Sequence, residues 1–203
     1  MEDPELTEYW GDLGQNWYIE QQYIKLYPIC RWAQPAVEGA LALVRDHGIS
    51  VDEIATIKVE TFHEAKRLAA IPTTTEQAQY SLPFSVAAAV VRGTIGVAEV
   101  TSDGLNDPQI IGLAKTVEIV EDDAFNDAFP ARRFARTHFH LQDGRILSSR
   151  DTEAQGDPEN KVPDQVIWDK FHGLTMPVLG KIWSEQFLTL AQGIADASSV
   201  TPL

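Results

Sequence analysis

The sequence predicts an α+β fold, a mainly antiparallel sheet with helices on one face, followed by a helical C-terminal tail. Short strand and helix patterns alternate over most of the chain, an Asp-Gly dipeptide at 143–144 marks a hairpin, and only helical patterns follow. The polar stretch 153–164 contains glycine and prolines and is the expected linker. Residues 13–152 should therefore form the sheet domain, and residues 165–197 a helical segment that docks on a partner or on the sheet domain.

The first elements resemble a βαβ unit. Residues 17–24, WYIEQQYI, are rich in β-formers and precede a Tyr-Pro breaker, which predicts a strand. Apolar residues at helical spacing predict a helix over 36–47 that ends at Gly48. The SVDE sequence at 50–53 matches a capping box, and the alternating segment 55–62 predicts the next strand.

The middle of the chain predicts a buried helix and a further strand. A short helical turn runs to Tyr80, and Pro83 lies in the first turn of a helix that ends at Gly93. The run SVAAAVV in this helix is apolar on every side, so we expect it to be the most buried helix. A short helix from Asp107 precedes a strand at 116–120.

The last elements are a hairpin and two helices. Alternating strands surround Asp143-Gly144, the dipeptide best suited to a type I′ turn. Beyond the linker, two helical segments are expected, separated near Pro177. Their apolar side chains must fold back on the sheet domain or dock on something outside this chain. These side chains are Trp168, Phe171, Leu174, Val178, Leu179, Ile182, Trp183, Phe187, Leu188 and Leu190.

Composition excludes several functions. Sixteen basic and thirty acidic residues give a formal net charge of −14, which repels nucleic acids and anionic membrane surfaces. A single cysteine and scattered histidines predict no disulfide framework and no metal site. The N-terminus has no signal-peptide pattern, and no apolar run approaches the ~20 residues of a membrane span. We therefore expect a soluble cytoplasmic protein.

Three sequence features carry a resemblance to a known family. Lys25, a Tyr-Pro turn and Cys30-Arg31 lead into an alanine-rich helix, a spaced I..I.V.T strand follows, and QAQYSLPF lies within residues 72–93. In this order and spacing they resemble the MmgE/PrpD family, which includes 2-methylcitrate dehydratase, cis-aconitate decarboxylase and iminodisuccinate epimerase. The resemblance extends from about Leu13 to about Leu179.

The resemblance implies an incomplete active site. Family members are much longer, with a large helical domain and a smaller α+β lid domain, and their active site lies between the two. This sequence resembles the lid domain plus the C-terminal segment, without the helical half that supplies most acid-base groups. The resemblance therefore implies a partner chain carrying the helical domain, or self-association through the C-terminal helices. It implies no cofactor, because the family's eliminations need none.

The candidate catalytic residues are Lys25 and Tyr80. Lys25 matches the lysine that relatives place at the interdomain cleft, where it could pair with a substrate carboxylate. The alternative is a solvated lysine at the end of a strand. Tyr80 is the nearest phenol to the QAQYSLPF motif, although half-buried packing would explain it equally. His63 could also reach a cleft, but an exposed loop histidine is the simpler interpretation.

The candidate substrate-binding residues are Lys25 together with four neighbours in the two motifs. Arg31 could hold a carboxylate through two parallel hydrogen bonds or be an exposed charge, and Ser81 is a polar neighbour of Tyr80. Cys30 lies where decarboxylase-like members carry histidine, or is a small buried residue. Phe84 lies where they carry a tyrosine, and phenylalanine cannot donate a proton. These changes argue against a decarboxylase of that kind, and no obvious general base remains.

Two function classes follow. The first is a subunit of a dehydratase, isomerase or decarboxylase of a small carboxylic acid, a lyase or isomerase in a complex and inactive alone. The second is a non-catalytic module, derived from the lid domain, that binds a ligand or a partner. An adjacent gene for the helical half would favour the enzyme.

Overall fold

The computed structural model describes residues 10–197. The chain divides into two compact units, one up to Asn160 and one from Lys161 onward. Among the described residues, the strands lie in the first unit, and the long helix α9 lies in the second.

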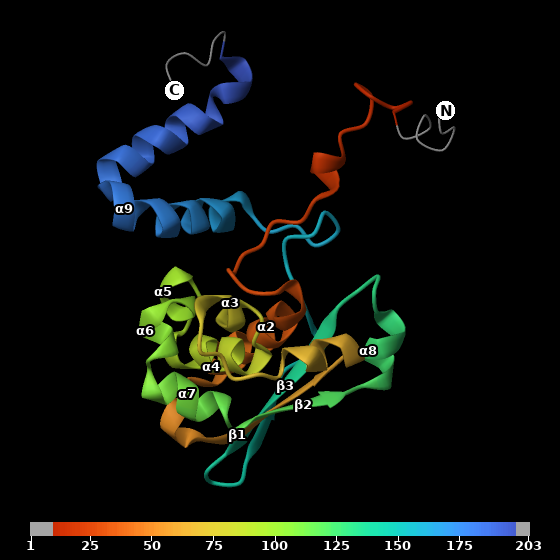
Figure 1. The fold of residues 1–203 in the computed structure, drawn as a ribbon, viewed down its shortest axis with the longest axis vertical. Coiled ribbons are helices and arrows are strands. Elements are labelled where there is room, and N and C mark those ends of the chain that lie inside the picture. The colour runs from red at the N-terminus through yellow and green to blue at the C-terminus, as the bar shows by residue number, and fades with distance from the viewer. Residues whose placement is uncertain (1–9, 198–203) are drawn as a thin grey trace. The chain divides into compact units, whose positions relative to one another are not determined.

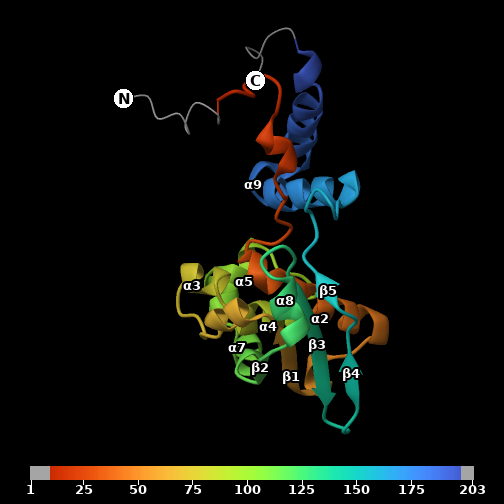
Figure 2. The same ribbon diagram turned by 90° about the vertical axis from the view of Figure 1, so that its right-hand side faces the viewer.

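A five-stranded, mostly antiparallel sheet forms the centre of the first unit (Figures 1 and 2). Its main path has the order β2-β1-β3-β4, and β5 also pairs with β3. Only the β1–β2 pair is parallel, while β3 runs antiparallel to β1, β4 and β5. The predicted fold class is therefore confirmed. The strands are β1 (Ile54–Thr61), β2 (Val117–Glu121), β3 (Phe134–Leu141), β4 (Ile146–Ser148) and β5 (Thr152–Glu153).

Seven short α-helices accompany the sheet in the described part of the first unit. Helix α2 packs on β3, and α4 packs between α2 and α7. Figure 1 shows α3 to α7 gathered on one side of the strands. The helices are α2 (Gln34–His47), α3 (Thr75–Gln79), α4 (Leu82–Arg92), α5 (Val97–Val100), α6 (Ser102–Leu105), α7 (Pro108–Ala114) and α8 (Asp123–Ala128). Short 3-10 turns cover Tyr18–Gln21, Arg31–Ala33, Val51–Glu53 and His63–Leu68.

Local start and stop signals fix the central helices as predicted. Helix α2 ends at Gly48, with φ of 62°, and α4 ends at Gly93, with φ of 72°. Both values lie in the left-handed region that favours glycine. The capping box at Ser50 and Glu53 is present before β1. Helix α4 is buried at every residue from Leu82 to Val90, because its all-apolar surface packs against neighbours on several sides.

The side chains of β3 alternate between a buried face, which packs against α2, and a half-buried face. Residues Ala135, Thr137, Phe139 and Leu141 are buried on the α2 side. The hydroxyl of Thr137 donates to the carbonyl of Ala36 at 3.1 Å. A Cβ on Gly39 would lie 2.9 Å from Thr137 Oγ1, so glycine allows this close approach of helix and strand. The alternate residues of β3 face the other side, and they are Phe134, Arg136, His138 and His140.

The predicted strand over residues 17–24 is wrong. Tyr18–Gln21 form a 3-10 turn, and Trp17, Tyr18 and Ile19 are exposed. The predicted βαβ-like unit is therefore absent, and α2 leads into β1 without a preceding strand. The physical reason is that β-propensity reflects packing against neighbouring strands, and this segment has no strand partner among the described residues.

The hairpin between β3 and β4 is confirmed, but its turn is not type I′. A type I′ turn needs positive φ at both central residues, and no described non-glycine residue has positive φ. Gly144, with φ of 87°, instead closes a three-residue loop. Its amide donates to the carbonyl of Leu141 at 3.0 Å, and the Leu141 amide donates to the carbonyl of Arg145 at 2.9 Å. Only glycine then occupies the left-handed position.

The second unit consists mainly of helix α9, Asp164–Gln192. Its helical geometry breaks at Gly180, with φ of 75° and ψ of 165°, close to Pro177, near which the separation was predicted. Glycine adopts this conformation without the strain that a side chain would impose, so the break falls three residues beyond the proline. The Phe171 and Phe187 rings stack at 6.2 Å, so the two halves of α9 contact each other.

Much of the apolar surface of α9 is exposed. Val178, Ile182 and Trp183 are 80%, 71% and 68% exposed. Leu174, Leu179, Phe187 and Leu190 are also exposed. Across residues 10–197, no helix combines the length and the apolar character needed to cross a membrane.

Candidate functional site

The two sequence motifs meet at one corner of the first unit. Lys25 is exposed, Cys30 is a half-buried free thiol, and the following 3-10 turn leads directly into α2. The Cys30 amide donates to the carbonyl of Gln79 at 2.6 Å. Gln79 immediately precedes Tyr80, which is 59% exposed. This backbone hydrogen bond therefore joins the segment of Lys25 to the segment of Tyr80, which are far apart in sequence.

Ser81 and Phe84 serve the fold at this corner. The Ser81 hydroxyl donates to the carbonyl of Ala70 at 2.6 Å and accepts from the Phe84 amide at 3.2 Å, which caps α4. Phe84 is fully buried in the hydrophobic core. Of the predicted site residues, Lys25, Cys30 and Tyr80 are the ones that retain solvent access.

Arg31 is buried and clamps the segment that follows β5. Its two terminal nitrogens donate to Gln34 Oε1 at 2.9 Å, and to the carbonyls of Gln155 at 2.6 Å and Ala154 at 3.2 Å. The same guanidinium forms an ion pair with Asp157. Its Nε atom is buried without a hydrogen-bond partner. Most of its donors are therefore engaged within the chain.

The Tyr23 ring lies over the Arg31 guanidinium, 4.6 Å from its central carbon. Beside it, the Ile24 amide donates to the carbonyl of Gly156 at 2.9 Å. Tyr23 and Ile24, which precede Lys25, therefore contact the Arg31 side chain and the segment that Arg31 clamps.

Tyr27 and Glu38 form a half-buried hydrogen-bonded pair that sequence analysis missed. The Tyr27 hydroxyl donates to Glu38 Oε1 at 2.9 Å, and the Gln155 amide donates to Glu38 Oε2 at 3.3 Å. Burial raises the pKa of the Glu38 carboxyl, and burial together with the Glu38 charge raises the pKa of Tyr27. The sequence signal for this pair was Glu38 itself, a charged residue within the apolar run PAVEGALAL of α2.

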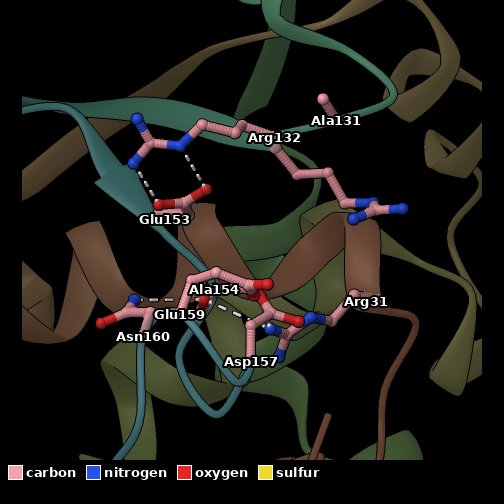
Figure 3. A pocket seen from close by; sticks show the side chains of 9 residues that line it. Arg31, Ala131, Arg132, Glu153, Ala154, Asp157, Glu159 and Asn160 are labelled. Carbon is pink, nitrogen blue, oxygen red and sulfur yellow. Dashed lines mark hydrogen bonds and ion pairs between the residues drawn. The ribbon is translucent and has the colours of Figure 1, made fainter. Parts of the chain in front are cut away.

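A pocket of about 380 Å³ lies beside the Arg31 clamp (Figure 3). Three arginines and three carboxylates line it: Arg31, Arg132, Arg133, Glu153, Asp157 and Glu159. Arg132 pairs with Glu153 through two hydrogen bonds of 3.0 and 2.6 Å, as the dashed lines in Figure 3 show. Two of the three arginines are therefore paired with carboxylates of the pocket wall.

The face of the sheet opposite α2 carries a charge network around Glu60. Lys58 Nζ lies 2.7 Å from Glu60 Oε1, and Arg136 Nη1 and His138 Nε2 lie 2.9 and 3.3 Å from Glu60 Oε2. The hydrogen bond from Lys58, with support from His138, lowers the pKa of Glu60 to about 2. Within residues 10–197, no group of three or more His, Cys, Asp and Glu side chains is arranged to hold a metal ion.

Comparison with protein families gives one match. The family model of the MmgE/PrpD C-terminal domain matches residues 27–195. This range includes Cys30, Arg31 and Tyr80, and it starts two residues after Lys25. No curated protein matches the chain.

Proposed function

The chain belongs to the MmgE/PrpD family through its C-terminal domain, and from this premise we propose that it is one half of an enzyme of small carboxylic acids. The proposed reaction is the dehydration, isomerisation or decarboxylation of such an acid, which makes the complex a lyase or an isomerase. The active site is completed by a separate helical half.

The observation that carries the proposal is the hydrogen bond between the Cys30 amide and the Gln79 carbonyl, 2.6 Å long. It connects the segments of Lys25 and Tyr80 at one corner of the first unit, where both residues are exposed to solvent. In this reaction class a base removes a proton next to a carboxylate, and cationic groups stabilise the charge that develops. Lys25 supplies that positive charge, and the Tyr80 hydroxyl is a proton donor.

The other predicted substrate-binding residues support this corner. Cys30 borders it with a half-buried thiol. Arg31, Ser81 and Phe84 act mainly by positioning, because their polar groups or rings are already engaged in the fold. Both oxygens of the Glu38 carboxylate also accept hydrogen bonds within the chain. A general base from outside this chain is consistent with these contacts.

The proposed partner surface is the apolar side of α9. Trp183, Phe187 and Leu190 are exposed there, and exposed clusters of large apolar side chains mark interaction surfaces. The occupant we propose is the helical half, carried by a partner chain or by a second copy of this chain. The family membership supports this assignment, since family members combine a lid domain with a helical domain.

A non-catalytic module is the alternative function. It is favoured by the structural use of Arg31, Ser81 and Phe84, which leaves few groups for chemistry in this half. Such a module would bind a ligand or a partner through the same surfaces without turnover.

Purification of the native protein with whatever remains bound to it separates the two functions. We expect a helical chain of the same family to co-purify, or the chain to self-associate, and sedimentation of the isolated chain to show a species other than a stable monomer. Substrate screening of the co-purified sample should then detect turnover of a small carboxylic acid. A monodisperse, cooperatively folding monomer with no partner and no turnover would reject the proposal.

A further inference from the structure

The pocket beside the Arg31 clamp contains arginine donors that the chain does not use. Arg133 lines this pocket, and it forms no ion pair with another described residue. The Nε atoms of both Arg133 and Arg31 are buried without a hydrogen-bond partner. A buried N–H group without an acceptor is unfavourable, and the described part of the chain leaves both of these donors unsatisfied.

The charges of the wall favour a ligand with one negative charge. Arg132 is neutralised by Glu153 and Arg31 by Asp157, while Arg133 is left without a carboxylate partner. The remaining acid, Glu159, is exposed, so water screens its charge. One added carboxylate compensates Arg133. A phosphate dianion would place a second charge among the three carboxylates already present.

From this arrangement we propose that the pocket binds a small carboxylic acid as its monoanion, held by the guanidinium edge of Arg133. The two oxygens of a carboxylate lie in one plane and match the paired N–H groups along that edge. The volume of about 380 Å³ is at the lower end for small-molecule sites, which run from about 300 to 1,000 Å³. The ligand is therefore a compact organic acid.

This binding site is additional to the proposed active corner. Lys25, Cys30 and Tyr80 do not line the pocket, whose wall is formed by Arg31 and by residues 131–133, 153, 154, 157, 159 and 160. Binding there does not depend on catalytic activity. A test of binding in this pocket is therefore independent of any test of the proposed function.

Titration of the full chain with acetate, followed by backbone amide NMR, tests the site. At constant pH and ionic strength, with chloride as the replaced anion, we expect saturable shifts in residues 131–133 and 153–160. Inorganic phosphate should bind more weakly than acetate. Arg133→Gln should raise the acetate dissociation constant at least tenfold, and Glu159→Gln should lower it.

Two further variants control for general electrostatics and for unfolding. Arg150→Gln removes an exposed arginine outside the pocket, so its acetate affinity should equal that of the unaltered chain. Arg133→Lys keeps the charge but loses the planar edge, and it should bind acetate more weakly than the unaltered chain. Acetate shifts in the unaltered chain that fail to saturate, tighter binding of phosphate, or equal losses in Arg133→Gln and Arg150→Gln would overturn the proposal.

Discussion

Arg31 was predicted to bind substrate, whereas its observed contacts lie within the chain. Its position beside Cys30 predicted a ligand for a substrate carboxylate, and the structure shows its terminal nitrogens bound to Gln34, Ala154, Gln155 and Asp157. Three of these partners, Ala154, Gln155 and Asp157, lie more than one hundred residues away in sequence, so no local pattern could reveal them. Arg31 therefore contributes to the first unit as a clamp.

Replacing Arg31 should reduce stability markedly. In Arg31→Gln the carboxylate of Asp157 and the carbonyls of Ala154 and Gln155 lose their shared donor, and removal of one partner of a buried pair costs roughly 3 kcal/mol. Urea denaturation of both proteins measures the difference in the free energy of unfolding. Arg145→Gln breaks the exposed pair with Asp143 and should cost less than about 1 kcal/mol. Equal losses in the two variants would refute the clamp.

At the scale of elements, the segment after β5 is held from two sides. Arg31 binds its carbonyls, and the Ile24 amide binds Gly156. Gly156 has φ of 94°, and a Cβ there would lie 2.3 Å from the carbonyl oxygen of Ile24. The close approach of the N-terminal segment therefore depends on a glycine at this position.

Gly156→Ala should destabilise the first unit more than Gly144→Ala. Gly144 has a similar φ of 87° and nothing within 4 Å of its Cβ position, so its variant measures the backbone strain alone, about 1–2 kcal/mol. The excess in Gly156→Ala measures the clash with Ile24. Thermal unfolding should show the lower midpoint for Gly156→Ala, and identical midpoints would mean that the Ile24 contact contributes nothing to stability.

The charge network around Glu60, on the face of the sheet opposite α2, should make the stability of the chain depend on pH. Because the pKa of Glu60 falls from 4.5 to about 2 on folding, the ionised carboxylate stabilises the folded chain above its ordinary pKa. This contribution is lost as the pH falls from 4.5 toward about 2.

Glu60→Gln should therefore lose stability near neutral pH, and the difference from the unaltered chain should shrink toward pH 2. Urea denaturation at several pH values measures this difference. Glu118→Gln, an exposed residue of β2, is the matched control and should show a smaller loss at neutral pH. A difference for Glu60→Gln that stays constant with pH would contradict the lowered pKa.

Elements with local signals were predictable, and elements defined by distant partners were not. Gly48, Gly93 and the Ser50 capping box mark their helix ends through short-range geometry, so periodicity and caps located α2, α4 and β1. Residues 17–24 have strand composition but no strand neighbour, and composition alone does not show whether a partner exists. The turn at Asp143-Gly144 was misassigned because loop length, which sets the turn type, follows from strand register.

The candidate site likewise combines residues that local motifs indicated with contacts that only the fold creates. The sequence motifs predicted Lys25, Cys30 and Tyr80 as site residues, and their segments are joined by the hydrogen bond between Cys30 and Gln79. The Tyr27–Glu38 pair and the arginine-lined pocket escaped prediction, because each depends on side chains that only the fold brings together.

For the whole molecule, the charge sets a condition on any acid substrate. A net charge of −14 repels anions at long range, so a carboxylate site has to be a local positive region. Lys25 at the corner and Arg133 in the pocket are the cationic residues that we propose for such sites, one for catalysis and one for binding. The exposed apolar side of α9 is the surface that we propose for binding the helical half.

The central claim is that this chain and a helical half form one active site to which Lys25 contributes. Turnover of 2-methylcitrate, citrate and cis-aconitate, measured for the isolated chain, for the assembled complex and for the complex with Lys25→Ala, tests it most directly. We expect no turnover by the isolated chain, turnover by the complex, and loss of turnover in the complex with Lys25→Ala. The control variant Lys115→Ala removes an exposed lysine at the end of α7, and turnover by its complex should be retained. Turnover by the isolated chain that survives Lys25→Ala would contradict the central claim.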